Sequence, residues 1–224
     1  RYIHAGATID LPHERLAVFW AALPHRLVET SDDARMALAV IPLSDALRWG
    51  LAERAMAELM RGAFLIAPAP STIDAALARQ WAEDADTGIA PGTTKLEIQA
   101  RLRRLCNVAE ILDPDDGDVV VRMTRWLEAH HREACSLDDL ARAVGLHPKY
   151  ASTRFRQTCG MSPWQYLLRL RVATAQRLLL TTRHTVLAIA EQAGFGSQAR
   201  CYAAFQDICG ESPGRWRRRQ RGWR

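Results

Sequence analysis

Apolar and polar residues alternate with a helical period over much of the second half of the chain. Apolar side chains recur every three or four positions in residues 148–159 and again in residues 198–209. This spacing predicts two amphipathic helices, each with one buried face and one face toward solvent. The residues expected to face inward are Ala151, Phe155 and Cys159 in the first helix, and Cys201, Phe205 and Ile208 in the second.

A longer helix is predicted between these two. The segment SPWQYLLRLRVATAQRLLLTT is rich in good helix formers. A helix of about 18 residues there would be roughly 27 Å long. Its leucines could bridge two packing units: Leu167, Leu168, Leu170, Leu178 and Leu179.

The first half of the chain has a different pattern. Four short strand-like segments occupy the first 42 residues, TIDL, LAVFWAAL, HRLVET and RMALAVIP. Helical periodicity follows at 44–61, 72–84 and 94–112. Their Ala- and Leu-rich surfaces fit dimerisation and packing onto a sheet equally well. The predicted fold class is therefore α+β, with an all-α C-terminal part.

A short sequence occurs twice, as FRQTCGMSP at 155–163 and FQDICGESP at 205–213. The glycine suits a left-handed residue just past a helix, the serine suits the N-cap of the next helix, and the proline suits its first turn. Each copy therefore predicts the end of one helix and the immediate start of another. These residues are Gly160, Ser162 and Pro163, then Gly210, Ser212 and Pro213.

A second correspondence lies upstream of each copy, in LARAVGLHPKYASTRF at 140–155 and IAEQAGFGSQARCYAAF at 189–205. Each has a short apolar-periodic segment, a glycine at a sharp turn (Gly145 or Gly194), and a second helix that ends in phenylalanine. The pattern predicts two helix-turn-helix units. The helix-start signals that agree with it are Ser136 with Asp139, as a capping box, and Ser197, as an N-cap.

Charge is distributed unequally along the chain. Residues 1–118 carry 12 Lys and Arg against 18 Asp and Glu, whereas residues 119–224 carry 18 against 7, a net charge of +11. The basic half indicates a polyanionic partner. The acidic, turn-prone DPDDGD stretch between the halves predicts a linker at 113–118, which separates an N-terminal domain (1–112) from a C-terminal one (119–224).

The composition indicates the cellular compartment of the protein. The chain is 48% hydrophobic and 25% charged, and its longest apolar runs are much shorter than the roughly 20 residues that span a bilayer. The five cysteines are scattered. We therefore expect a cytoplasmic protein with no membrane partner.

The C-terminal half resembles the AraC/XylS family of bacterial transcription regulators. The resemblance covers about 119–219 and rests on the ordered glycines and phenylalanines and on the final G-x-S-P followed by Trp216 and Arg217. It implies sequence-specific binding of double-stranded DNA by two unequal helix-turn-helix units and recruitment of RNA polymerase. The family commonly has arginine where this chain has Ala203.

The outward faces of the two predicted helices supply the candidate DNA-binding residues. Arg156 and Gln198 are the strongest candidates for reading bases, because Arg pairs with guanine and Gln with adenine. Arg200, Ser197 and the basic cluster at 215–221 suit phosphates better. The full candidate set is Lys149, Ser152, Thr153, Arg156, Ser197, Gln198, Ala199, Arg200, Tyr202 and Ala203.

The N-terminal half resembles the cupin-like sensor barrel of the same family, through LAVFWAALPHRLVET followed by IPLSDALRW, over roughly 6–112. The resemblance implies a small-molecule effector such as a sugar, and a homodimer. Glu14 departs from the pattern, and the earlier strands are missing, so we expect a partial, N-terminally truncated barrel. The candidate ligand-binding residues are Trp20, His25 and Trp49, although each fits a core role better.

Three other functions have some support in the sequence. A metal-dependent cupin enzyme would use His4, His13 and His25, but the expected second-motif histidine position holds Ala17. A DNA-repair methyl acceptor would need an activated thiol, and neither Cys106 nor Cys135 has activating neighbours in sequence. A dimerising scaffold leaves the basic half unexplained. We therefore expect no catalysis, no metal and no cofactor.

Overall fold

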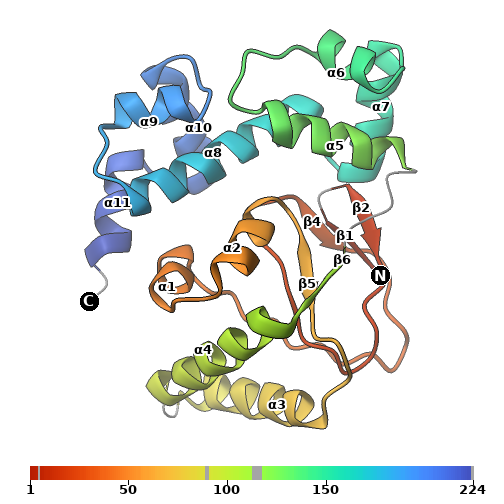
Figure 1. Ribbon diagram of the computed structural model, residues 1–224, viewed down its shortest axis with the longest axis vertical. Coiled ribbons are helices and arrows are strands. Elements are labelled where there is room, and N and C mark those ends of the chain that lie inside the picture. The colour runs from red at the N-terminus through yellow and green to blue at the C-terminus, as the bar shows by residue number, and fades with distance from the viewer. Residues whose placement is uncertain (5, 89–90, 113–117, 223–224) are drawn as a thin grey trace. The chain divides into compact units, whose positions relative to one another are not determined.

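The computed structural model describes residues 1–4, 6–88, 91–112 and 118–222 (Figure 1). The chain divides into two compact units. The first comprises Arg1–Tyr2, Thr8–Trp20 and Leu27–Asp113, and the second comprises Ile3–Ala7, Ala21–Arg26 and Pro114–Arg224. The predicted linker at 113–118 lies outside the described residues except for Asp118.

In its described residues, the N-terminal part of the chain combines short strands with four helices. Its strands are β1 (Tyr2–His4), β2 (Ala7–Ile9), β3 (Ala17–Val18), β4 (His25–Leu27), β5 (Phe64–Ile66) and β6 (Glu110–Leu112), and its helices are α1 (Leu43–Arg48), α2 (Glu53–Met60), α3 (Thr72–Thr87) and α4 (Pro91–Val108). The strands form two three-stranded sheets, β2-β1-β4 and β3-β5-β6. In the second sheet β5 pairs antiparallel with both neighbours, with Ala17 opposite Ile66 and Phe64 opposite Leu112.

Strand β5 lies at the centre of the first unit's core. All three of its residues are buried, and Leu65 packs in a cluster with Leu59 of α2 and Cys106 of α4. Polar contacts join α3 to α4: Arg101 forms a two-pronged ion pair with Asp74, and the Trp81 indole donates to Glu97 at 2.9 Å.

The expected strand and helix boundaries in this region were partly wrong. The expected helix at 44–61 is two helices, because Gly50 adopts a left-handed φ of +61° and ends α1. The strand expected at 35–42 is not formed, and residues 110–112, which we expected to end a helix, form β6 instead. The pairing of β6 with β5, over forty residues away in sequence, overrides the local helical preference.

The expected partial cupin-like barrel is not confirmed. Among the residues that the structure describes, the strands form two three-stranded sheets and no closed barrel. The physical reason is their length, because strands of two or three residues make too few ladder hydrogen bonds to wrap around a barrel. The fold class is α+β, with small sheets and a helical C-terminal part.

The second unit contains seven helices in its described part. They are α5 (Val119–His130), α6 (Leu137–Ala143), α7 (Pro148–Cys159), α8 (Pro163–Thr181), α9 (Val186–Gln192), α10 (Gln198–Cys209) and α11 (Pro213–Gly222). One hydrophobic core joins α5, α6 and α7, and also takes in Leu23, which is 2% exposed. A second core joins α9, α10 and α11. Helix α8 contributes Leu167 to the first core and Leu179 to the second, which confirms the predicted bridging helix.

The predicted helix ends are confirmed with their caps. Gly160 and Gly210 are left-handed at the ends of α7 and α10, with φ of +73° and +71°. The Ser162 hydroxyl accepts a hydrogen bond from the backbone amide of Gln165 at 3.2 Å. The Gln165 side-chain oxygen in turn accepts one from the backbone amide of Ser162, which completes a capping box. The Ser136–Asp139 capping box is also formed. None of the helices in the described ranges is both long enough and apolar enough to cross a membrane.

A buried carboxyl group in the first core makes stability depend on pH. Burial raises the pKa of Glu128, on α5, to about 7, although the Tyr166 hydroxyl donates to it at 3.0 Å and the charge of Arg125 also opposes the shift. The folded protein therefore holds a proton between pH 4.5 and about 7, where the unfolded chain has lost it. The free energy of unfolding should fall across this range as pH rises, by on the order of 3 kcal/mol.

The variant Glu128→Gln should remove this part of the pH dependence and be more stable than the parent chain above pH 7. Urea denaturation at pH 5 and pH 8 measures it, with the exposed Glu133→Gln as the matched control. Equal pH slopes for the parent chain and Glu128→Gln would contradict the prediction.

Candidate nucleic-acid interface

The first helix-turn-helix unit is formed by α6 and α7. Its turn contains Gly145, whose φ of +70° favours glycine, as the sequence predicted. Helix α7 begins after His147, whose ring nitrogen Nδ1 accepts a hydrogen bond from the Lys149 amide at 3.3 Å. The inward face is confirmed, because Ala151 and Phe155 are fully buried.

The second helix-turn-helix unit is formed by α9 and α10. The Thr185 hydroxyl caps α9 and the Ser197 hydroxyl caps α10, where it accepts from the Arg200 amide at 3.3 Å. Gly194, in the turn, has a φ of +83°. Cys201 and Phe205 are fully buried, as predicted for the inward face of α10.

Residues 131–133, between α5 and α6, join the two helix-turn-helix units to the bridging helix α8. Arg171 of α8 is 5% exposed and donates to the carbonyls of His131 and Glu133 at 2.7 and 2.8 Å. The His131 ring lies 2.8 Å from the Thr174 hydroxyl. A side chain at Gly194 would meet the same segment, because a Cβ there would lie 2.5 Å from the His131 carbonyl oxygen. These close contacts therefore fix the placement of the two helix-turn-helix units relative to each other.

The candidate DNA-binding residues of α7 face solvent, with one exception. Lys149, Thr153 and Arg156 are exposed, whereas Ser152 is half-buried. The Thr153 hydroxyl donates to the Lys149 carbonyl at 2.9 Å, so part of its hydrogen-bonding capacity is already used. The sequence analysis missed a second exposed stripe, which the three- and four-residue spacing of Tyr150, Arg154 and Gln157 could have revealed.

The candidates on α10 are exposed as well, apart from the half-buried Ser197, which serves as the N-cap. Tyr202 is 39% exposed although it is aromatic. Gln206 continues the exposed stripe beyond the predicted set, and its side chain donates to the Gly210 carbonyl at 3.1 Å. The exposed candidates are Gln198, Ala199, Arg200, Tyr202 and Ala203.

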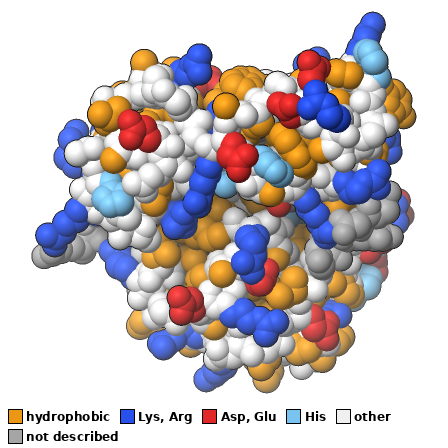
Figure 2. Space-filling view, turned by 45° about the horizontal axis from the view of Figure 1, so that its top comes forward, with side chains coloured by type: hydrophobic (Ala, Val, Ile, Leu, Met, Phe, Trp, Pro, Cys, Tyr) orange, Lys and Arg blue, Asp and Glu red, His pale blue; other side chains and the backbone are white. Residues whose placement is uncertain are grey.

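The two helices differ in charge. The exposed face of α7 carries Lys149, Arg154 and Arg156 and the helix has no acidic residue, whereas α10 carries one arginine, Arg200, and one aspartate, Asp207. On the face shown in Figure 2, Lys and Arg side chains lie singly or in small groups among hydrophobic and uncharged ones. Electrostatic attraction to a polyanion is therefore stronger at α7 than at α10.

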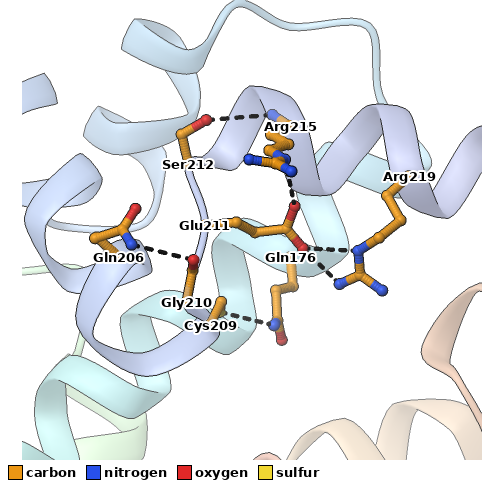
Figure 3. Close-up of polar contacts among 8 residues, drawn as sticks. All are labelled: Gln176, Gln206, Cys209, Gly210, Glu211, Ser212, Arg215 and Arg219. Carbon is orange, nitrogen blue, oxygen red and sulfur yellow. Dashed lines mark hydrogen bonds and ion pairs between the residues drawn. The ribbon is translucent and has the colours of Figure 1, made fainter.

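The basic cluster at 215–221 is a helix whose arginines bind protein groups. Glu211 is paired with Arg219 at 2.6 Å and lies 4.0 Å from Arg215, and Ser212 caps the helix (Figure 3). Arg217 and Arg221 donate to carbonyls at the end of α8, both of them to that of Leu179 at 3.1 Å. These contacts stabilise the C-terminal end of α8. They favour a structural role for most of the cluster over the expected phosphate contacts.

The three candidate ligand residues differ in their exposure to solvent. Trp49 is 8% exposed and packs in a cluster with Ala67 and Leu105, and Trp20 is half-buried in the same unit. His25 belongs to the second unit and is exposed, and its ring nitrogen Nδ1 lies 2.9 Å from the Leu23 carbonyl. The core reading of Trp49 therefore fits better than a ligand contact.

The residues weighed for metal and thiol chemistry have ordinary surroundings. His4 is buried, and no group of three or more His, Cys, Asp or Glu in the described ranges could hold a metal ion. Burial raises the pKa of the Cys106 and Cys135 thiols, which disfavours the reactive thiolate.

Comparison with known proteins places this geometry in a family. Residues 140–219 match the family described as a helix-turn-helix domain. The melibiose operon regulatory protein of Escherichia coli (strain K12) is 23% identical over 233 residues, which cover 97% of this chain and 77% of that protein. A Streptomyces lividans protein named as an AraC-like transcription regulator is 30% identical over 111 residues, covering 50% of this chain and 35% of that protein. Residues 140–219 belong to the AraC family of helix-turn-helix domains in DNA-binding transcription regulators.

The solved structures include a similar DNA-binding domain. One is the crystal structure of the DNA-binding domain of AdpA, a global transcriptional factor, in complex with a target DNA. Its sequence is 30% identical to that of the present chain, and the match covers 48% of the present chain and 97% of the AdpA domain, with a TM-score of 0.46. The named relatives favour transcription regulation over the enzyme and scaffold alternatives.

Proposed function

We propose that this AraC-family regulator recognises a specific double-stranded DNA site by placing α7 and α10 in successive major grooves. The observation that carries the proposal is the bridging helix α8, which packs in the cores of both helix-turn-helix units. Its 19 residues span about 28 Å, close to the roughly 34 Å between major grooves on one face of the duplex. One chain can thus present two recognition helices without a dimer.

The base-reading roles follow from side-chain chemistry. Arg156 suits a guanine, with its two acceptors, and Gln198 suits an adenine. Lys149 and Arg154, exposed beside Arg156, suit the phosphates that flank the first groove. Phosphate contacts would hold the register, and the base contacts would give the sequence preference.

The first compact unit of the chain, which contains α1 to α4, is proposed as the regulatory part. The similarity to the melibiose operon regulatory protein extends over 97% of the chain and so includes this unit. A small-molecule effector such as a sugar, a cupin-like ancestry of the short sheets, a homodimer, recruitment of RNA polymerase and a cytoplasmic location are proposals that rest on the family. Of the three predicted ligand contacts, Trp20 and His25 remain candidates, whereas the burial of Trp49 in a core cluster favours a packing role.

Fluorescence anisotropy tests the DNA-binding proposal. The full chain is titrated onto a site enriched from random duplex DNA and onto a scrambled duplex, at several salt concentrations. Binding should prefer the enriched site, and its affinity should fall with salt at a slope that indicates roughly 4 to 8 phosphate contacts.

The variants Arg156→Ala and Gln198→Ala should each weaken specific binding by about 1–3 kcal/mol and relax the preference at one base pair. Arg104→Ala, on the exposed face of α4, removes one positive charge elsewhere and is the matched control. Equal binding of all sequences by the parent chain, or an equal loss for Arg104→Ala and Arg156→Ala, would contradict the proposal.

A further inference from the structure

The outward face of α10 is unusually apolar for a helix that faces DNA. Ala199 and Ala203 lie one turn apart on it and are exposed, and Tyr202 beside them is 39% exposed. These side chains are not part of the core, whose α10 members are Cys201, Ala204 and Phe205. The face therefore presents two methyl groups and one aromatic ring to whatever α10 contacts.

The charged groups of α10 lie at the margins of this face. Arg200 bends back toward the preceding turn, where its guanidinium lies 4.0 Å from the position of a Cβ on Gly196. Asp207 lies in the last turn, beyond the residues that lead into a groove. Two exposed polar groups remain near the two alanines: Gln198, in the first turn, and Gln206, three residues after Ala203. The Gln206 side chain already donates to the Gly210 carbonyl, which leaves Gln198 as the group able to meet a base with its whole amide.

This combination matches the major-groove edge of an A·T base pair. Thymine presents the only methyl group there, and adenine presents a donor and an acceptor that one Gln amide can meet together. Guanine would need an Arg or Lys donor, which the centre of this face lacks. Because the alanine side chains are short, the helix backbone can approach the base edges closely.

The exposed face of α7 has the opposite character. Lys149 and Arg156 supply the cationic donors that guanine and phosphates take. The two recognition helices therefore differ in the contacts that they can make with DNA. Helix α7 supplies most of the electrostatic attraction to the phosphates, and α10 supplies contacts that depend on apolar groups.

We propose that the second recognition helix selects an A·T-containing half-site, with Ala199 and Ala203 against thymine methyl groups and Gln198 on adenine. The inference rests on the proposed function, since it requires that α10 enters a major groove. It adds the chemical class of base that α10 takes and the atom on which recognition depends, the C5 methyl carbon of thymine.

Replacement of thymine by deoxyuridine isolates that methyl group, because base pairing and phosphate charge are unchanged. The two half-sites of the enriched DNA are first assigned by repeating the enrichment with Arg156→Ala, which should relax the preference only in the half that α7 reads. Deoxyuridine is then placed in one half at a time, and affinity is measured by fluorescence anisotropy on the full chain.

Deoxyuridine in the α10 half should weaken binding about fourfold for each contacted methyl group, from the ~0.8 kcal/mol that a buried methylene contributes. Deoxyuridine in the α7 half should change affinity less than twofold. Ala203→Ser, which adds a polar hydroxyl to the exposed face, should reduce the discrimination in the α10 half. Ala85→Ser on the exposed face of α3 is the matched control and should leave it unchanged.

The failures of the two proposals are distinguishable. Specific, salt-dependent binding that is insensitive to deoxyuridine in the α10 half, or equally sensitive in both halves, would overturn the inference and leave DNA recognition intact. A G·C-rich α10 half in the enriched sites would do the same. Loss of any preference for the enriched site would overturn the proposed function and this inference with it.

Discussion

Gly194→Ala should lower the free energy of unfolding of the second unit by roughly 2–5 kcal/mol. Two costs add at this residue. Its φ of +83° is left-handed, which costs an alanine roughly 1–2 kcal/mol. The new Cβ would also lie 2.5 Å from the His131 carbonyl oxygen and 2.6 Å from the Arg132 Cα. Both are backbone atoms, so relief requires the chain to shift, and overpacking of this kind costs roughly 1–3 kcal/mol more.

Gly145→Ala, in the corresponding turn of the first helix-turn-helix unit, separates the two costs. Gly145 also has a positive φ, +70°, but a Cβ there would have nothing within 4 Å. Its substitution should therefore cost only the backbone contribution, roughly 1–2 kcal/mol. Urea denaturation followed by far-ultraviolet circular dichroism measures both variants. Equal losses for the two would show that the contact with residues 131–132 contributes nothing.

The helix boundaries of the second unit were predictable because their signals are local. A serine cap, a proline in the first turn and a left-handed glycine each act within a few residues, so α7 and α10 begin and end where the sequence indicated. The buried and exposed faces of both helices follow from spacing alone. Ser152, half-buried, is an exception, because its exposure depends on how neighbouring helices cover it.

The N-terminal part was less predictable because its structure depends on distant partners. Residues 110–112 have helical periodicity, but they pair with β5, and β5 itself is an apolar run of three residues without alternation. Gly50 is a usable local signal, since glycine commonly ends a helix, but the apolar periodicity continues on both sides of it and predicts one longer helix. Leu23 shows the same limit of local reasoning, because its core partners lie about a hundred residues further along the chain.

The candidate site shows the same division between local and distant determinants. Which side chains face outward on α7 and α10 could be read from the sequence. The contacts that place one helix relative to the other could not, because residues 131–133 carry no recognisable motif. Arg171 reads as one more basic residue on a helix, yet it is 5% exposed and binds two backbone carbonyls.

Arg171→Met should lower the free energy of unfolding by about 2–4 kcal/mol. Methionine replaces much of the apolar stem but none of the donors, so the carbonyls of His131 and Glu133 lose their partners in a buried site. Part of the loss should come from the stacking of the guanidinium on the Trp164 ring, 5.7 Å away. Burial lowers the pKa of this guanidinium, because desolvation disfavours its charged form, and the nearby charge of Arg200 lowers it further.

Arg169→Met, on the exposed side of the same helix, is the matched control and should stay within about 0.5 kcal/mol of the parent chain. A loss for Arg169→Met as large as that for Arg171→Met would contradict the assignment. In the double variant with Gly194→Ala, both substitutions act on residues 131–133. If that segment is displaced by the first change, the second has less left to disrupt, and the combined loss should fall short of additivity by about 0.5–3 kcal/mol. Strict additivity would mean that Arg171 and Gly194 hold the two helix-turn-helix units independently.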